Sequence, residues 1–239
     1  MKKLSYILLF ALTTALSSCA DFLDRHSTAY DSDGFFKSEY GLEQGVTGIY
    51  RLVPFNLNWD VPPTMVQDVY TAFALQETEN TTIGAGGGLN PDQSYVNTYW
   101  AGHWNIIGRA NSVIDGAKTD VNDMTATYRQ HLCEAKVLRA YAYYNLMTTF
   151  GDIPFFTSSV TPEQYTAGRT DKKIIADYLI NELTEIAESE ALEWTASQRG
   201  RVDRATAYAL ASRFALFAGS LDFGGESQAY FQKAADAAK

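Results

Sequence analysis

Residues 133–156 have the pattern of a long helix with a defined end, and this segment constrains the fold more than any other part of the chain. Apolar residues recur along it with helical spacing, at Ala135, Leu138, Ala142 and Leu146. These side chains share one helical face, which predicts that the helix packs against a core. Gly151 follows the last of them, and Pro154 prevents the helix from resuming. We therefore expect a helix over about residues 124–150, followed by a turn.

Helical spacing is also present on both sides of this segment. Further helices are expected at residues 39–52, from about Ser94, from a cap at Thr170 or Asp171, at residues 203–218, and from Ser227 to Lys239. Two of them carry clear stripes, at Trp100, Trp104, Ile107, Asn111 and Ile114, and at Ile175, Leu179, Leu183 and Ile186. A third carries small residues four apart, at Ala207, Ala211, Ala215 and Gly219. Such a stripe lets another helix approach closely.

Residues 53–97 interrupt this regularity. Prolines and glycines break any long element there, at Pro54, Pro62, Pro63, Gly84, Gly86, Gly87, Gly88 and Pro91. A loop of this length in a compact domain is usually functional or disordered. No stretch has a convincing strand pattern. The expected fold class is therefore all-α, with tetratricopeptide-like antiparallel helix hairpins and one long irregular loop excursion.

The amino terminus has the features of a lipoprotein signal peptide. Two lysines precede an apolar run, residues 4–16, which is too short to span a bilayer as a helix. Small residues then lead into Cys19, as in a lipobox, so Cys19 is expected to become the first mature residue and to carry acyl chains such as palmitate. Residues 1–18 would be removed, and residues 19–38 would form a tether and lead-in with a turn at residues 31–34. A plain secretory signal with an incidental cysteine is the alternative.

Charge and cysteine content limit the possible partners. The net charge is −9, and it becomes about −11 without residues 1–18, which hold two lysines and no acidic residue. We therefore expect no nucleic-acid partner, because phosphates require a basic surface. Lipidation of Cys19 leaves Cys133 as the one remaining thiol, so no internal disulfide is expected. Cys133 is interpreted as a small buried apolar group.

No group of residues has the spacing of a metal site. His131 and Cys133 are two positions apart, so on a helix they point about 200° from each other and cannot share one ion. Residues 31–34 begin like a calcium loop but lack its later ligands, and glycine-rich residues 84–88 lack the lysine of a P-loop. His103 is interpreted as a partly buried polar group at a helix flank. We expect neither a metal nor a cofactor.

Catalytic groups are also not apparent. Glu182 and Glu185 are expected on an exposed helix face, whereas a glycosidase needs two carboxylates that flank a bond in a cleft. No nucleophile stands beside a base. The chain is therefore expected not to be an enzyme.

Three motifs carry a resemblance to a known family. The first is Glu134-Ala135-Lys136-x-Leu138-Arg139-Ala140-Tyr141, continuing to Phe150-Gly151-Asp152-Ile153-Pro154. The second is Trp100-x3-Trp104 with Ala110-Asn111, and the third is Gly200-Arg201 followed by Ala205 and Ala209-Leu210. Together they closely resemble the SusD/RagB-like outer-membrane lipoproteins, which capture nutrients, mostly glycans, at the cell surface. The resemblance covers nearly the whole mature chain and implies that residues 39–239 form helix pairs.

The resemblance also implies a function and partners. The protein would bind an oligosaccharide on the outer membrane and hand it to a SusC-like TonB-dependent transporter. Two alternatives remain open: a RagB-like member that binds peptides, and a non-catalytic helical scaffold for protein partners. Family members run to about twice this length, and the last expected helix has no terminating glycine. We therefore expect an amino-terminal fragment that lacks a carboxy-terminal half.

A sugar-binding surface needs aromatic rings to stack on pyranose faces and polar groups to satisfy hydroxyls. Trp100 and Trp104 have helical spacing, which favours a place in the core. Loop residues are better candidates, because binding groups concentrate on loops held by a rigid scaffold. The expected ligand contacts are Trp59, Asp60, Tyr70, Phe73, Asn80, Tyr95 and Asn97, and of these Trp59 with Asp60 is the strongest.

Overall fold

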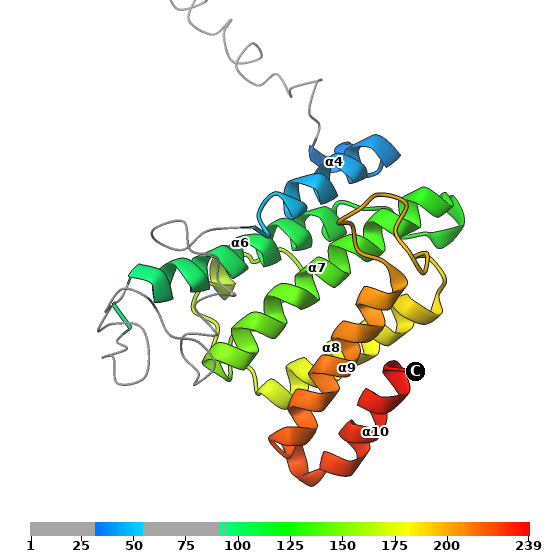
Figure 1. The fold of residues 1–239 in the computed structure, drawn as a ribbon. Coiled ribbons are helices and arrows are strands. Elements are labelled where there is room, and N and C mark those ends of the chain that lie inside the picture. The colour runs from blue at the N-terminus through cyan, green and yellow to red at the C-terminus, as the bar shows by residue number, and fades with distance from the viewer. Residues whose placement is uncertain (1–31, 55–90, 93) are drawn as a thin grey trace, which may run out of the picture.

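The computed structural model describes residues 32–54, 91–92 and 94–239, and these residues are predominantly helical (Figure 1). The α-helices are α3 (Ser32–Phe35), α4 (Glu39–Tyr50), α6 (Ser94–Asp115), α7 (Ala126–Phe150), α8 (Lys172–Glu188), α9 (Arg204–Ser220) and α10 (Ser227–Ala237). Short 3-10 helices are η2 (Val121–Asp123), η3 (Pro162–Gln164) and η4 (Phe223–Gly225). Within the described ranges, the one β pairing is an isolated bridge between Ile153 and Thr170. The expected all-α class is confirmed.

Consecutive long helices pack as hairpins. Helix α6 packs along α7, α8 along α9, and α9 along α10, while α4 lies against both α6 and α7 (Figure 1). Helix α7 also contacts α8 and α9, so it joins the two hairpins. The resulting array holds one continuous apolar core that includes residues of α4 through α10. None of the described helices combines the length and the apolar character needed to cross a bilayer.

Capping residues explain where the helices start and stop. Ser38, Thr125, Asp171 and Asp203 each accept a hydrogen bond from a backbone N–H in the first turn of α4, α7, α8 and α9. Gly151 ends α7 with a φ of 75°, a conformation that glycine adopts without strain. The expected cap at Asp171 and the expected end of α7 are confirmed. The expected continuation of the last helix to Lys239 is wrong, because α10 ends at Ala237.

The apolar stripes face the core as their spacing predicts. Ile175, Leu179, Leu183 and Ile186 on α8 are buried, and so are Ala207, Ala211, Ala215 and Gly219 on α9. Helix α10 approaches α9 at this small-residue stripe. A Cβ built on Gly219 would lie 2.8 Å from a ring carbon of Phe231 on α10. The close approach of two helices at this stripe is therefore confirmed.

The end of the expected lead-in packs on the helical array. Ser32–Phe35 form the single turn α3 where a simple turn was expected. The Phe36 ring lies against Gly45 of α4, where a Cβ would come within 2.7 Å of it. The Tyr128 hydroxyl on α7 donates a hydrogen bond of 2.7 Å to the Phe36 carbonyl. These contacts attach the chain before α4 to the core of the array.

Candidate functional site

Most of the expected ligand residues fall outside the described part of the chain. This applies to Trp59, Asp60, Tyr70, Phe73 and Asn80, and also to the expected lipidation site, Cys19. Tyr95 and Asn97 were expected in the loop, but both belong to the first turns of α6, where Asn97 is exposed. The helix begins at Ser94 because Pro91 is the last proline before the aromatic stripe, so nothing prevents helical backbone from there on.

The tryptophans of α6 belong to a packed aromatic cluster. Trp100 and Trp104 are half-buried against the core, with ring centroids 5.6 Å apart. Trp100 meets Phe150 edge-on at 5.0 Å, and Trp104 meets Tyr143 edge-on at 6.0 Å. Such edge contacts stabilise packed rings. The two tryptophans pack against the core, but both are only partly buried, so the expected place in the core is met in part.

His103 directly precedes Trp104 on α6 and is more buried than expected. Only 1% of the residue is exposed, so the interpretation as a partly buried group is wrong. Its Nδ1 donates a hydrogen bond of 2.8 Å to the Tyr99 carbonyl, and its ring lies 4.4 Å from the Tyr99 ring. Burial lowers the pKa of His103 to about 4, so the imidazole is neutral at neutral pH.

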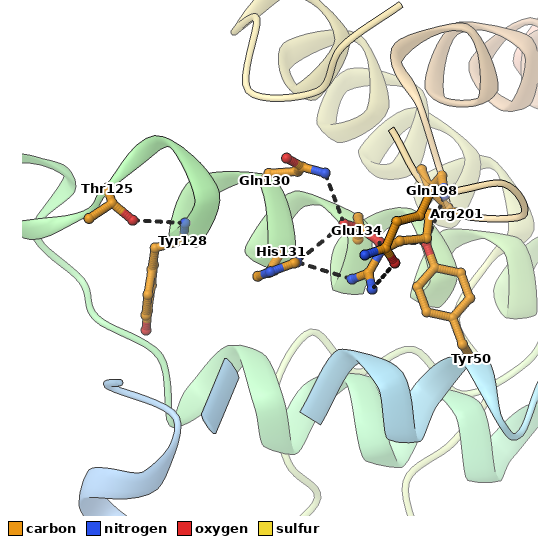
Figure 2. A network of polar contacts seen from close by, with 9 residues as sticks. Tyr50, Thr125, Tyr128, Gln130, His131, Glu134, Gln198 and Arg201 are labelled. Carbon is orange, nitrogen blue, oxygen red and sulfur yellow. Dashed lines mark hydrogen bonds and ion pairs between the residues drawn. The ribbon is translucent and has the colours of Figure 1, made fainter. Parts of the chain in front are cut away.

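Glu134 on α7 is the centre of a buried polar cluster, which we call the Glu134 cluster (Figure 2). The Tyr50 hydroxyl at the end of α4 donates to its Oε2 over 2.6 Å. Arg201, in the segment before α9, donates from Nε to the same oxygen over 2.9 Å. His131 lies 3.3 Å from the other oxygen, Oε1. The cluster thus joins three segments that are far apart in the sequence.

The protonation of the Glu134 cluster follows from these contacts. Burial would raise the pKa of Glu134, but the hydrogen bonds from His131, Tyr50 and Arg201 together lower it below its usual value. The carboxylate is therefore ionised and paired with Arg201. The Nδ1 of His131 lies within hydrogen-bonding distance of both Glu134 and the Arg201 Nη2, at 3.3 Å and 3.1 Å. One nitrogen can serve only one of them, so the tautomer of His131 decides which contact forms.

Arg139, one turn further along α7, is the centre of a second buried cluster, which we call the Arg139 cluster. Its Nη2 donates to both carboxylate oxygens of Glu182 on α8, over 2.7 Å and 3.0 Å. Its Nη1 donates to the Asn111 side chain on α6 over 2.9 Å and to the Thr157 carbonyl over 2.7 Å. Because Glu182 is only 9% exposed, the expectation that it lies on an exposed face is wrong, whereas Glu185 is exposed as expected.

The Arg139 cluster holds the loop that follows α7. Asn111 donates from Nδ2 to the carbonyls of Phe156 and Ser158, over 3.1 Å and 2.8 Å. The Tyr143 hydroxyl donates to the Phe156 carbonyl over 2.9 Å. With the bond from Arg139 to Thr157, three successive carbonyls of this loop are satisfied by buried side chains. The loop is therefore fixed against α6 and α7.

The three family motifs of the sequence meet in these two clusters. Glu134 and Arg139 come from the first motif, Asn111 from the second and Arg201 from the third. Sequence reasoning missed their partners Tyr50 and Glu182, which sit in no motif. A charged residue inside an apolar period is the signal that could have pointed to Glu182. Internal hydrogen bonds engage both carboxylates and both Nη atoms of Arg139, whereas Arg139 Nε is buried without a partner in the described part of the chain. The clusters therefore position the helices relative to one another.

The described ranges were also compared with the requirements of a metal site and of a reactive thiol. No three His, Cys, Asp or Glu residues in this part of the chain gather in an arrangement that could hold a metal ion. Cys133 is half-buried, and burial raises the pKa of its thiol to about 11. A thiol of this kind is protonated at neutral pH and is a poor nucleophile. Of the expected ligand contacts, five lie in the segment between α4 and α6, outside the described residues, and Tyr95 and Asn97 lie on α6.

Comparison with known proteins relates the whole scaffold to one family. The model of the SusD-like family described as "Starch-binding associating with outer membrane" matches residues 21–216. A curated relative, SusD-like protein P2 of Formosa agariphila, is 27% identical over 254 aligned residues, which cover all of this chain and 46% of the relative. The chain therefore spans less than half the length of this relative.

Solved structures share the fold. A SusD-like carbohydrate-binding protein from Bacteroides fragilis superposes with a TM-score of 0.65 and 21% identity, covering 84% of this chain and 41% of that one. The surface glycan-binding protein A from Bacteroides thetaiotaomicron, solved with laminarihexaose, gives a TM-score of 0.56 at 15% identity, with 81% of this chain and 42% of that one covered. At these identities the likeness establishes the arrangement of helices.

Proposed function

This chain belongs to the SusD-like family, and from that premise we propose that it binds oligosaccharides at the bacterial cell surface. The observation that carries the proposal is the family match over residues 21–216, whose description names starch binding and the outer membrane. The laminarihexaose bound to a protein of the same fold supports a glucan as the class of ligand. Binding, not bond cleavage, is the proposed chemistry, because the buried carboxylates Glu134 and Glu182 are each paired with an arginine.

The scaffold supports a binding role for residues 53–97. This segment leaves the array after α4 and rejoins it at α6, and these two helices pack against each other and against α7. Tyr50, at the end of α4, is fixed by Glu134, and the aromatic rings of α6 fix its other boundary. A long connection with both ends held by a rigid framework is a suitable place for binding groups. We assign the ligand contacts to Trp59, Asp60, Tyr70, Phe73 and Asn80, together with Tyr95 and Asn97 on α6.

Calorimetry with defined ligands tests this function. The mature protein is titrated with maltoheptaose, as a fragment of starch, with laminarihexaose and with a panel of peptides. We expect saturable binding of at least one glucan and none of the peptides. Trp59→Ala should weaken glucan binding about thirtyfold, because loss of a central aromatic contact costs about 2 kcal/mol.

A matched variant controls for the loss of any exposed ring. Tyr165 is 75% exposed and lies beyond α7, so Tyr165→Ala should leave the affinity unchanged. Unchanged binding by Trp59→Ala would remove that residue from the site. Binding of peptides in place of glucans would overturn the proposed ligand class.

We also propose how the protein is placed in the cell. Residues 1–18 act as a leader, Cys19 carries acyl chains in the outer membrane, and residues 19–38 connect the anchor to the helical domain of residues 39–239. The family match begins at residue 21, behind Cys19, which supports a separate leader. The bound sugar passes to a SusC-like TonB-dependent transporter. Co-purification of such a transporter with the tagged full chain would support this step, and its absence from the purified membrane complex would contradict it.

A further inference from the structure

The residues just before α4 are held by several elements of the array at once. Residues 34–39, which we call the strap, lie where α6 ends and α7 begins. The Phe36 ring fits between two glycines. A Cβ on Gly45 of α4 would lie 2.7 Å from one edge of the ring, and a Cβ on Gly116, directly after α6, would lie 2.6 Å from the other edge. A side chain at either glycine would displace the ring, so the two glycines form a socket for it.

Hydrogen bonds hold the strap on α7 as well. The Phe36 carbonyl accepts a hydrogen bond of 2.7 Å from the Tyr128 hydroxyl, whose oxygen accepts one of 2.8 Å from the Lys118 backbone N–H. Tyr128 is itself buried. At the other end of the strap, the Glu39 carboxylate accepts a hydrogen bond from the Thr125 hydroxyl. Thr125 and Tyr128 both lie at the start of α7 (Figure 2).

The strap lies between the proposed lipid anchor and the first long helix. A pull on Cys19 reaches residues 34–39 before it reaches α4. If the strap were free, the pull would act on α4 alone, which could then separate from α6 and α7 one turn at a time. The strap joins α4, α7 and the turn after α6, so several contacts have to break together. Forced unfolding is governed by the rate of such a step, and the strap should slow it.

We propose that the strap carries the pull of the membrane anchor into the helical array, with the Phe36 ring as its fixed point. The inference rests on the proposed acylation of Cys19, which supplies the pull. The strap keeps α4 packed on α6 and α7 while the chain is held from its amino-terminal side. The contacts are internal to the chain, and none involves a residue beyond the first turn of α7.

Optical tweezers test the strap in the soluble chain from residue 19 onwards. The chain carries Cys133→Ala and is held between the thiol of Cys19 and a second thiol, introduced by Glu188→Cys at the exposed end of α8. We expect Phe36→Ala to shorten the lifetime of the folded chain under constant force about tenfold, because the ring no longer fills its socket. Gly116→Ala, which fills the socket from the other side, should shorten the lifetime to a similar extent.

A second pulling geometry separates load bearing from a general loss of stability. Tyr40 is 68% exposed and directly follows the strap, so Tyr40→Cys together with Cys19→Ala lets the chain be held at a point that bypasses the socket. Phe36→Ala should then have a much smaller effect on the lifetime. Gly108→Ala controls for Gly116→Ala, because no atom lies within 4 Å of the position that its Cβ would take, and it should shorten the lifetime in neither geometry.

The outcomes separate the strap from the proposed anchor. Equal shortening by Phe36→Ala in both geometries, or no shortening when the chain is held at Cys19, would overturn the strap and leave the anchor and the proposed glycan binding standing. Retention of Cys19→Ala in the outer membrane of cells would remove the source of the pull, and it would overturn the anchor and this inference together.

Discussion

Arg139 is among the largest fully buried side chains in the described structure, and it carries a positive charge into the centre of the array. Removing a guanidinium from water is costly unless its hydrogen bonds are replaced. Glu182, Asn111 and the Thr157 carbonyl replace most of them. The contribution of each partner to the stability of the fold therefore depends on the presence of the others. Loss of one partner leaves a buried charge without compensation.

A double-mutant cycle measures this dependence. Arg139→Met should lower the free energy of unfolding by about 3–5 kcal/mol, because it leaves Glu182 buried without its cation. Arg139→Met combined with Glu182→Leu should recover much of that loss, since both charges are then replaced by apolar groups. Urea unfolding gives the values. Glu185→Ala, on the exposed side of the same helix, should change stability by less than about 0.5 kcal/mol. Equal losses in the single and double variants would contradict the pairing.

His103 should make stability depend on pH. Its pKa is about 4 in the folded chain against an ordinary value of 6.5, so the unfolded chain binds more protons between these values. The stability that the neutral imidazole contributes to the fold is fully present above pH 6.5 and is lost as the pH falls towards 4. The wild type should lose up to about 3 kcal/mol more than His103→Gln over this range. Chemical denaturation at each pH measures the difference, and parallel curves for the two proteins would refute it.

For helix α7, the periodicity of the sequence predicted some structural features and missed others. Its end at Gly151 and its apolar face were predictable from spacing. The structure buries further residues on other sides, including Val137, Tyr143 and Met147, because α4, α6, α8 and α9 all contact this helix. A one-face pattern assumes one neighbour, so it could not reveal a helix surrounded on several sides. The same assumption led to the wrong prediction that Glu182 is exposed to solvent.

The start of α4 depends on a glycine that a side chain cannot replace. A Cβ on Gly41 would overlap the carbonyl oxygen of Phe35, so Gly41→Ala should destabilise the fold by about 1–3 kcal/mol. Gly48, in the same helix, has no neighbouring atom within 4 Å of the position that a Cβ would take, and Gly48→Ala should stabilise by up to about 1 kcal/mol. Thermal unfolding of the two variants gives the comparison. A stabilising Gly41→Ala would show that the approach of α3 to α4 is not tight.

For the molecule as a whole, the hairpin order was predictable because each helix carries its own spacing, caps and breakers. The polar clusters were not, because they depend on which helices meet. Asn111 was identified as part of a helical stripe and a family motif, and Arg201 as part of another motif. Their contacts with Arg139 and Glu134 depend on how the helices assemble. The exposed ring of Trp194 was not predicted, because the expected ligand contacts were confined to residues 59–97. In the sequence, the one feature that could have indicated it is that Trp194 stands alone between two expected helices.

Membrane attachment is expected to rest on one atom, the sulfur of Cys19. Cys19→Ala should release the mature chain from the outer membrane, because no acyl chain can then be attached. Cell fractionation followed by mass spectrometry of the amino terminus measures both location and lipid. Cys133→Ala is the matched control and should remain in the membrane. Persistence of Cys19→Ala in the outer-membrane fraction would rule out the proposed anchor.

The reach of the Glu134 cluster has a consequence for the order in which the chain assembles. Glu134 takes one partner from 84 positions away, Tyr50, and another from 67 positions away, Arg201. Until Arg201 has been synthesised, the first hairpin would enclose a carboxylate with no cation beside it. The first hairpin therefore reaches its full stability only once the segment before α9 has been made, so the two hairpins should unfold together.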